Sequence, residues 1–438
     1  MNNILSSSAA KNILRKIMPP ILLLCFVSIC FFSQFSNSVT VDEFSHFPSG
    51  LYILKTRDWR MNKEAPPLIK CLPALSSLTT KPKIETQPFQ DVPNTWRLGY
   101  SFMNLNKDRY QSVFTYGRCI IIILGLLLGL TVYFWGKELY GYKGALLALS
   151  LYVFNPNILA HSSLVTIDIG VSLTIFFSVY CLWKYLRAPT AFSIALAGVA
   201  LGLAQLSKFT ALLLYPIYFF IFVTLYIANG LKKKDQKIKF PATSIFKYGK
   251  DFLIIILISI LIINFGYLFS NSFLPASGYH FSSGLLKNIF SLFGSGFPIP
   301  LPYDYLTGFD YQLAQAVGGH PFYVSYLMGE HSLTGWWYYY IVSFLVKNPV
   351  PFLIMLAMTI IACMEIKEAR TDTVSFLCIW VPAIAYFFYF SFFTHSPIGI
   401  RYLLPIFPFL FLASGFLFHQ AIIKFKRIQY LLMFLIII

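Results

Sequence analysis

Long apolar stretches separated by short polar segments dominate this chain. A span of about twenty apolar residues crosses roughly 30 Å of hydrocarbon. By that measure the sequence predicts ten membrane-spanning helices, over residues 19–38, 114–136, 142–160, 165–185, 192–207, 209–228, 252–271, 340–363, 374–393 and 401–419. An eleventh run begins at Ile428 and the sequence ends at Ile438, so we expect either an incomplete last helix or a missing C-terminal continuation. The prediction is an all-α polytopic membrane protein with a single membrane domain, residues 1–438.

Composition and charge support a membrane protein. With 57% hydrophobic and only 12% charged residues, the chain cannot cover a soluble globule with a polar surface. The net charge of +17 raises the question of nucleic acid, but the lysines and arginines lie in short loops between apolar runs. We therefore predict membrane lipids as surroundings and no nucleic-acid partner.

The basic loops also predict the orientation. Those at residues 11–16 and 232–239 fall on one side when the crossings are counted, and the positive-inside rule makes that side cytoplasmic. The N-terminus is then cytoplasmic, and two long loops, residues 39–113 and 272–339, face outward. A removable signal peptide over residues 1–38 is the alternative, and its cleavage would not change which side the outer loops face. We expect a bacterial inner (cell) membrane protein with its active site on the periplasmic face.

The first outer loop carries the most informative residues, the adjacent carboxylates Asp42 and Glu43. Charges held near hydrocarbon cost energy and suggest chemistry, and Glu64 and Asp168 are further acidic residues on the same side. The loop also predicts two amphipathic helices lying on the membrane surface. Their apolar residues recur at helical spacing: Phe44, Phe47, Leu51 and Leu54, then Leu68, Leu72, Leu75 and Leu78.

The second outer loop contains a polar and aromatic stretch with Glu330, His331 and Trp336. Such a segment suits a substrate-contacting lid better than a strand or helix. Its tryptophans also suit the usual interfacial aromatic belt. Glu330 with His320, His331 and His395 offers metal-binding side chains, but the spacing matches no known ligand pattern, so a divalent metal ion is left open.

Three cations lie at or just beneath the outer face: Lys208, Lys347 and Arg401. An unpaired charge inside the membrane costs about 2.5–3.5 kcal/mol on insertion scales. The outer carboxylates would offset that cost, and so would the phosphate of a lipid headgroup.

These features, taken together, resemble a known family, the integral-membrane glycosyltransferases of the GT-C type, and within it the protein O-mannosyltransferase and aminoarabinose transferase branch. The shared motifs run in family order over nearly the whole chain: Val41-Asp42-Glu43 with His46, Glu64-Ala65-Pro66-Pro67-Leu68 with Lys70, His161 to Asp168, Gly202-Leu203-Ala204 with Ser207-Lys208-Phe209-Thr210, Gly329-Glu330-His331-Ser332 with Gly335-Trp336-Trp337, Lys347-Asn348-Pro349, and Gly399-Ile400-Arg401-Tyr402. One departure is Ala65, where many bacterial relatives look to have histidine or lysine, so no donor contact is carried over to it.

The resemblance implies transfer of a sugar from a polyprenyl-phosphate donor to an acceptor hydroxyl on the outer face, with inversion. Asp42 would take the acceptor proton, and Glu43 or Asp168 would orient it or steady positive charge on the sugar. Lys208, Lys347, Arg401 or a divalent cation would stabilise the leaving phosphate, with Glu64 in the same donor region.

Two other functions stay open. A polytopic transporter or flippase would place charges near mid-membrane and show internal symmetry, and a non-catalytic GT-C-like scaffold would serve as an assembly partner. The sequence encodes neither the sugar nor whether the acceptor is a protein, lipid or glycan.

Overall fold

The computed structural model describes residues 8–234, 242–318, 324–365, 372–393 and 399–418. Helices make up nearly all of the regular structure, and only one two-stranded hairpin occurs among these residues. The eleventh apolar run, beginning at Ile428, lies outside the described residues. The predicted all-α polytopic fold is confirmed.

The membrane-spanning part is built from long apolar helices. They are α1 (Ser8–Ser33), α6 (Tyr110–Val153), α8 (Asp168–Arg187), α10 (Leu214–Lys234), α11 (Ala242–Gly266), α17 (Thr373–Phe393) and α18 (Phe407–Ser414) with its flanking turns η5 (Ile400–Ile406) and η6 (Gly415–Phe418). The shorter apolar helix α9 (Ala191–Gln205) packs against α8 and α11. Within the described ranges, seven helical segments are long and apolar enough to cross a membrane, or eight when the bent pair α14 (Tyr339–Lys347) and α15 (Val350–Glu365) counts as one span.

Four of the predicted spans take a different form in the structure. The runs at 114–136 and 142–160 meet in α6, which is interrupted at Gly141, whose φ of +70° and ψ of −171° are non-helical and favour glycine. The run at 192–207 is the 15-residue α9. The run at 340–363 breaks between α14 and α15, whose axes meet at 116°. Pro349 lies at this break, and the residue before a proline avoids the helical conformation.

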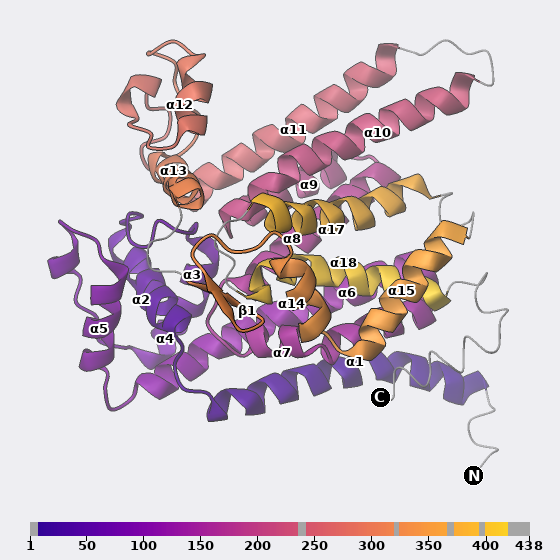
Figure 1. Cartoon of the computed structure of the whole chain (residues 1–438), viewed down its shortest axis with the longest axis horizontal. Helices are drawn as coiled ribbons and strands as arrows, with labels where there is room; N and C mark the ends of the chain where they lie inside the picture. Colours follow the sequence, from indigo (N-terminus) through magenta and orange to yellow (C-terminus); the bar gives the residue numbers. More distant parts are fainter. Residues whose placement is uncertain (1–7, 235–241, 319–323, 366–371, 394–398, 419–438) are drawn as a thin grey trace.

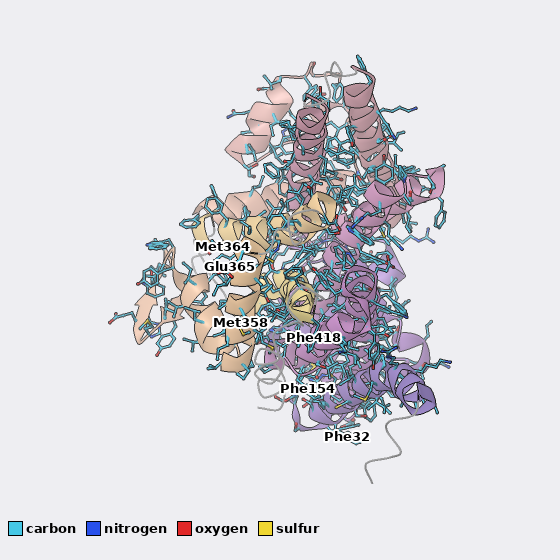
Figure 2. All side chains as sticks on the ribbon, turned by 90° about the vertical axis from the view of Figure 1, so that its right-hand side faces the viewer. Phe32, Phe154, Met358, Met364, Glu365 and Phe418 are labelled. Carbon is cyan, nitrogen blue, oxygen red and sulfur yellow. The ribbon has the colours of Figure 1, made fainter. Side chains whose placement is uncertain are left out.

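The core of the bundle lies where α18 packs between α6, α8 and α17. Aromatic rings fill it, with Trp135 of α6 contacting Phe176 of α8 and Phe409 of α18. Elsewhere α9 approaches α11 closely, because a Cβ atom on Gly202 would lie 2.5 Å from Ile262. Figure 2, which looks along the molecule from the right of Figure 1, shows Met358 of α15 and Phe418 of η6, both in a satellite apolar cluster.

The two long loops form folded segments at one end of the bundle, on the left of Figure 1, while the described ends of α10, α11 and α15 lie at the opposite end. The first loop holds α2 (Val41–Thr56), α3 (Leu68–Ala74), α4 (Ser77–Thr80), η2 (Gln87–Phe89) and α5 (Thr95–Leu105). The first predicted amphipathic helix forms as α2, whereas the second is divided into the seven-residue α3 and the four-residue α4. The apolar face of α2, however, packs against protein, with Phe47 in ring contact with Phe102 of α5 and Phe114 of α6.

The second loop is more ordered than the sequence predicted. It holds η4 (Ala276–Gly278), α12 (Gly284–Ser291), α13 (Tyr303–Gly318) and the hairpin of β1 (Ser325–Leu327) and β2 (Glu330–Ser332). In the antiparallel register, Ser325 pairs with Ser332 and Tyr326 with His331. The expectation that residues 329–337 avoid strand structure is therefore wrong for residues 330–332, because Met328 and Gly329 adopt positive φ values, as a tight hairpin turn requires.

Candidate active site at one end of the bundle

Asp42 lies in the first turn of α2 and forms an ion pair with Arg401 of η5. The two residues are 359 positions apart in the sequence. Both side chains are partly open, with 32% of Asp42 and 25% of Arg401 exposed. Asp42 is thus a carboxylate with a cationic partner that an incoming molecule can reach.

Asp168 begins α8 and is buried, with only 4% of its side chain exposed. Its Oδ1 accepts a hydrogen bond from Nζ of Lys208 at 3.2 Å. Its Oδ2 lies 3.7 Å from Nδ1 of His161, in α7 (Pro156–Ser162). A charge buried this deeply needs a partner, and Lys208 supplies it. The structure therefore brings together three predicted site residues with Asp42, namely Asp168, Lys208 and Arg401.

Tyr402 links the two ion pairs. Nζ of Lys208 lies 4.6 Å from the centre of the Tyr402 ring, and the guanidinium carbon of Arg401 lies 5.9 Å from it. Both distances are within the range of cation–π attraction. One aromatic ring thus holds two cations in neighbouring positions, each with an aspartate as its counter-ion.

Two histidines complete the cluster. His46 lies four residues after Asp42 and therefore on the same face of α2. Burial lowers the pKa of His46 to about 4, an effect larger than the opposing attraction of Asp42. Burial likewise lowers the pKa of His161, although Asp168 favours its charged form. Both imidazoles are neutral at neutral pH. From the sequence, these two histidines were noted only as parts of longer motifs. The four-residue spacing of His46 from Asp42 already indicated that the two side chains share one helix face.

Glu43 has a different environment from its neighbour Asp42. It forms a bidentate ion pair with Arg118 of α6, at 2.7 Å from Oε1 and 2.8 Å from Oε2, and both side chains are fully buried. Its oxygens also accept hydrogen bonds from the amides of Thr40 and Val165. With every lone pair engaged, Glu43 caps α2 and joins it to α6 and the segment before α8. It has no free position for a substrate proton.

Arg118 was missed by the sequence analysis. Besides Glu43, its guanidinium donates to the carbonyl oxygens of Gln34, Asn37 and Ser38, which link α1 to α2. The signal was present, since a lone arginine within the apolar run at 114–136 demands a buried partner.

The other predicted donor-binding residues, Glu64 and Lys347, lie on separate elements. Glu64 is exposed on the loop before α3. Lys70 of α3 is buried, and its Nζ donates to the carbonyl oxygens of Asn62 and Ala65, both at 2.6 Å. Burial lowers the pKa of Lys70 to about 8. Lys347 ends α14 with an exposed side chain, and its carbonyl accepts from the Asn157 amide.

The predicted substrate-loop residues lie apart from the site formed by Asp42, Asp168, Lys208 and Arg401. Within the described part of the chain, no hydrogen bond or ion pair joins them to it. Glu330 and His331 are exposed on β2, where the His331 ring packs on Tyr326 at 5.2 Å. Trp336 instead packs against the main core of the bundle. His320 and His395 lie outside the described residues. Among the described residues no group of three or more His, Cys, Asp or Glu could hold a metal ion.

Similarity to known proteins agrees with this architecture. Residues 109–240 match the family model of the dolichyl-phosphate-mannose-protein mannosyltransferases. No curated protein matches the sequence significantly. Among solved structures, ArnT from Cupriavidus metallidurans bound to undecaprenyl phosphate is similar over 93% of this chain and 60% of its own, with 13% identity and a TM-score of 0.55.

The oligosaccharyltransferase of Archaeoglobus fulgidus, tethered to an acceptor peptide containing the NVT sequon, is similar over 98% of this chain and 54% of its own, with 14% identity and a TM-score of 0.55. The same enzyme in complex with Zn and sulfate gives a TM-score of 0.54 at 14% identity, over 96% of this chain and 50% of its own. The chain thus spans between half and two thirds of the length of these structures. The helical bundle and these similarities together identify the chain as an integral membrane protein of the GT-C glycosyltransferase fold.

Proposed function

We propose that this protein transfers a sugar from a polyprenyl-phosphate-linked donor to an acceptor hydroxyl on the outer face of the membrane, with inversion at the anomeric carbon. The observation that carries the proposal is the pairing of Asp42 with Arg401 and of Asp168 with Lys208 around the ring of Tyr402. This arrangement offers an accessible base beside two cations, which is what attack on a phosphate-activated sugar requires. The fold likeness to ArnT and the oligosaccharyltransferase supports it.

Lys208 and Arg401 would bind the donor phosphate. Each cation already has an aspartate on one side and the Tyr402 ring on another. A lipid phosphate at this level would share both cations and spread their charge over its oxygens. As the sugar–phosphate bond breaks, negative charge grows on the leaving oxygen, and cations fixed in place stabilise it without reorganising.

Asp42 would act as the general base. Of the three predicted catalytic carboxylates it is the most open, since 32% of its side chain is exposed against 4% for Asp168 and 0% for Glu43. In the reaction, the acceptor oxygen forms a bond to the anomeric carbon while its proton passes to the Asp42 carboxylate. The bond between that carbon and the phosphate oxygen breaks, and its electron pair leaves with the polyprenyl phosphate. Asp42 then returns the proton to water.

Asp168 would hold Lys208 and His161 in place, and the neutral rings of His46 and His161 would bind hydroxyl groups of the sugar or acceptor. The Nδ1 atoms of both rings are buried without a hydrogen-bond partner. A neutral imidazole offers one donor and one acceptor, which matches a hydroxyl group. Glu64, Lys347 and the Glu330, His331 and Trp336 segment stay at the periphery, as residues that would contact substrate only if the second loop closes as a lid.

We further propose that the protein lies in a bacterial inner membrane with the N-terminus cytoplasmic and this site on the periplasmic face, following the basic loops. A divalent cation, which the sequence left open, would add its positive charge to that of Lys208 and Arg401 at the leaving phosphate if one binds there.

The test is transfer by the purified chain in nanodiscs, supplied with radiolabelled polyprenyl-phosphate sugars and a membrane extract of acceptors. We expect release of lipid phosphate and label on an acceptor with the unmutated protein and with Asp91→Asn, which changes an exposed carboxyl on the same loop. We expect neither product with Asp42→Asn. Full transfer by folded Asp42→Asn would exclude Asp42 as the base, and no turnover of any donor by the unmutated protein would refute the transferase.

A further inference from the structure

A second feature at the outer end concerns the outer lobe, residues 268–313. It projects sideways from the bundle, at the upper left of Figure 1, beyond the outer end of α11. The lobe has its own apolar core of Tyr279, Leu286, Ile299 and Leu306. Backbone hydrogen bonds close it, including the amide of Phe273 to the carbonyl of Ile299 at 2.9 Å. Its exposed apolar residues are therefore not needed to fill its own core.

Helix α12 in this lobe has three distinct faces. Leu286 and Phe290 point into the lobe core. Leu285, Ile289 and Leu292 follow at helical spacing on a second face and are 54%, 40% and 83% exposed. Lys287, about 200° from Leu285 around the helix, marks a polar third face. A helix with one apolar face packed and another in the open requires a second apolar environment.

The exposed apolar surface of the lobe continues the lipid-facing surface of α11. Only 22% of the most apolar stretch of α11 is buried. Exposed apolar residues recur at every fourth position along it: Leu253, Leu257, Leu261 and Phe265. The ring of Phe265 contacts Phe269 at 5.1 Å, and the exposed Phe273 follows. From there the surface passes to Phe297 and Phe293, whose rings stack at 4.7 Å at the end of α12.

The distribution of charged residues also indicates an apolar environment for the lobe. Lys287 is the only Asp, Glu, Lys or Arg between Phe269 and Tyr303, whereas the first outer loop carries such residues throughout. A soluble segment of this length would carry more charge. A helix with exposed leucine and isoleucine on one side and a single lysine on another has the pattern of a helix lying in the membrane interface.

We propose that the outer lobe is a membrane anchor, in which Leu285 and Ile289 of α12, and Leu292 directly after it, insert into the acyl chains of the outer leaflet. The partner is the lipid bilayer itself, reached as a direct continuation of the α11 surface. The anchor holds α13 at a fixed depth, and α13 in turn packs against Phe209 at the start of η3, next to Lys208. The proposal does not depend on the glycosyltransferase activity.

The test replaces Leu292, and in a second protein Lys287, with the photo-crosslinking residue p-benzoylphenylalanine in the full chain. Each protein is reconstituted in liposomes of phosphatidylethanolamine and phosphatidylglycerol, irradiated, and analysed by mass spectrometry. We expect lipid adducts at position 292 in several-fold higher yield than at 287, because only the first lies on the inserted face. Leu285 serves as an equivalent position if the Leu292 variant does not fold.

Two results would overturn the anchor. Crosslinking of position 292 to a second copy of the chain would make this face a protein interface. Equal and low lipid yields at positions 292 and 287 would leave the face in water, in contradiction to its composition.

Discussion

The buried pair of Glu43 and Arg118 gives the sharpest prediction about stability. Glu43→Gln removes the negative charge and replaces one accepting oxygen with an amide group that also donates. Arg118 donates to both Glu43 oxygens and is fully buried. The substitution leaves its charge without a counter-ion. Because arginine cannot lose its proton inside a protein, a pKa shift cannot relieve the cost.

The expected magnitude follows from the burial. Breaking a buried ion pair by removing one partner costs about 3–5 kcal/mol. With an unfolding entropy of about 2.1 cal/mol/K per residue, taken from soluble proteins, that cost corresponds to a fall in Tm of about 3–5 °C for a chain of this length. The assay is thermal unfolding of purified protein in one detergent, followed by scattering or thiol exposure.

The matched control makes the same chemical change at an exposed pair. Glu138→Gln removes the carboxylate paired with Lys184 at 2.8 Å, where the side chains are 35% and 46% exposed. A surface pair contributes about 0–1 kcal/mol, so this variant should melt close to the unmutated protein. The double variant Glu43→Gln with Arg118→Met removes both buried charges and should recover part of the loss.

Equal melting of Glu43→Gln and Glu138→Gln would refute the reasoning, since burial would then make no difference. A further outcome bears on the site. If Glu43→Gln melted normally but lost all transfer, Glu43 would belong to the reaction and not to the anchoring of α2.

The remaining predictions concern the cluster around Asp42. Lys208→Gln should raise KM for the lipid-linked donor by about tenfold to a hundredfold, because a charge-assisted contact contributes about 1.5–3 kcal/mol. Initial rates measured against donor concentration would show this increase. Arg401→Lys should lower kcat more than it changes the melting temperature, because the lysine cannot reproduce the planar contact with Asp42 and Tyr402, and single-turnover assays would measure this. His46 has a lowered pKa of about 4 when folded against an ordinary 6.5, so its stabilising contribution should be complete above pH 6.5 and lost as the pH falls toward 4. His46→Gln should flatten melting temperature against pH in that window, and an unchanged slope would contradict the assignment.

The sequence predicted the spans well because each crossing must remain apolar over about twenty residues. It missed the break between α14 and α15, although Pro349 was visible. There the Asn348 side chain lies within hydrogen-bond distance of Asn155, at 3.3 Å. Such tertiary contacts lie at the 116° bend, and no local pattern encodes them.

The sequence predicted which charged residues make up the candidate site, but not which of them form ion pairs with each other. Asp42, Asp168, Lys208 and Arg401 stand out because charges beside apolar runs are costly. The sequence does not show which cation meets which carboxylate, and although it favoured Asp42 as the base, it gave no sign that Glu43 is buried. The helix separates them, since adjacent residues point about 100° apart, one toward Arg401 and the other into the protein.

The pairing of Asp42 with Arg401 also has a consequence for how the protein is made. During synthesis the first carboxylate enters the membrane while its partner, 359 residues later, is still untranslated. At about 5–20 residues per second the gap lasts roughly 20 to 70 s. Throughout that interval the nascent chain carries Asp42, the proposed base, without its counter-ion. The growing polypeptide cannot hold a complete site until its last described helix has been inserted, so completion of the bundle itself sets the moment at which the site is assembled.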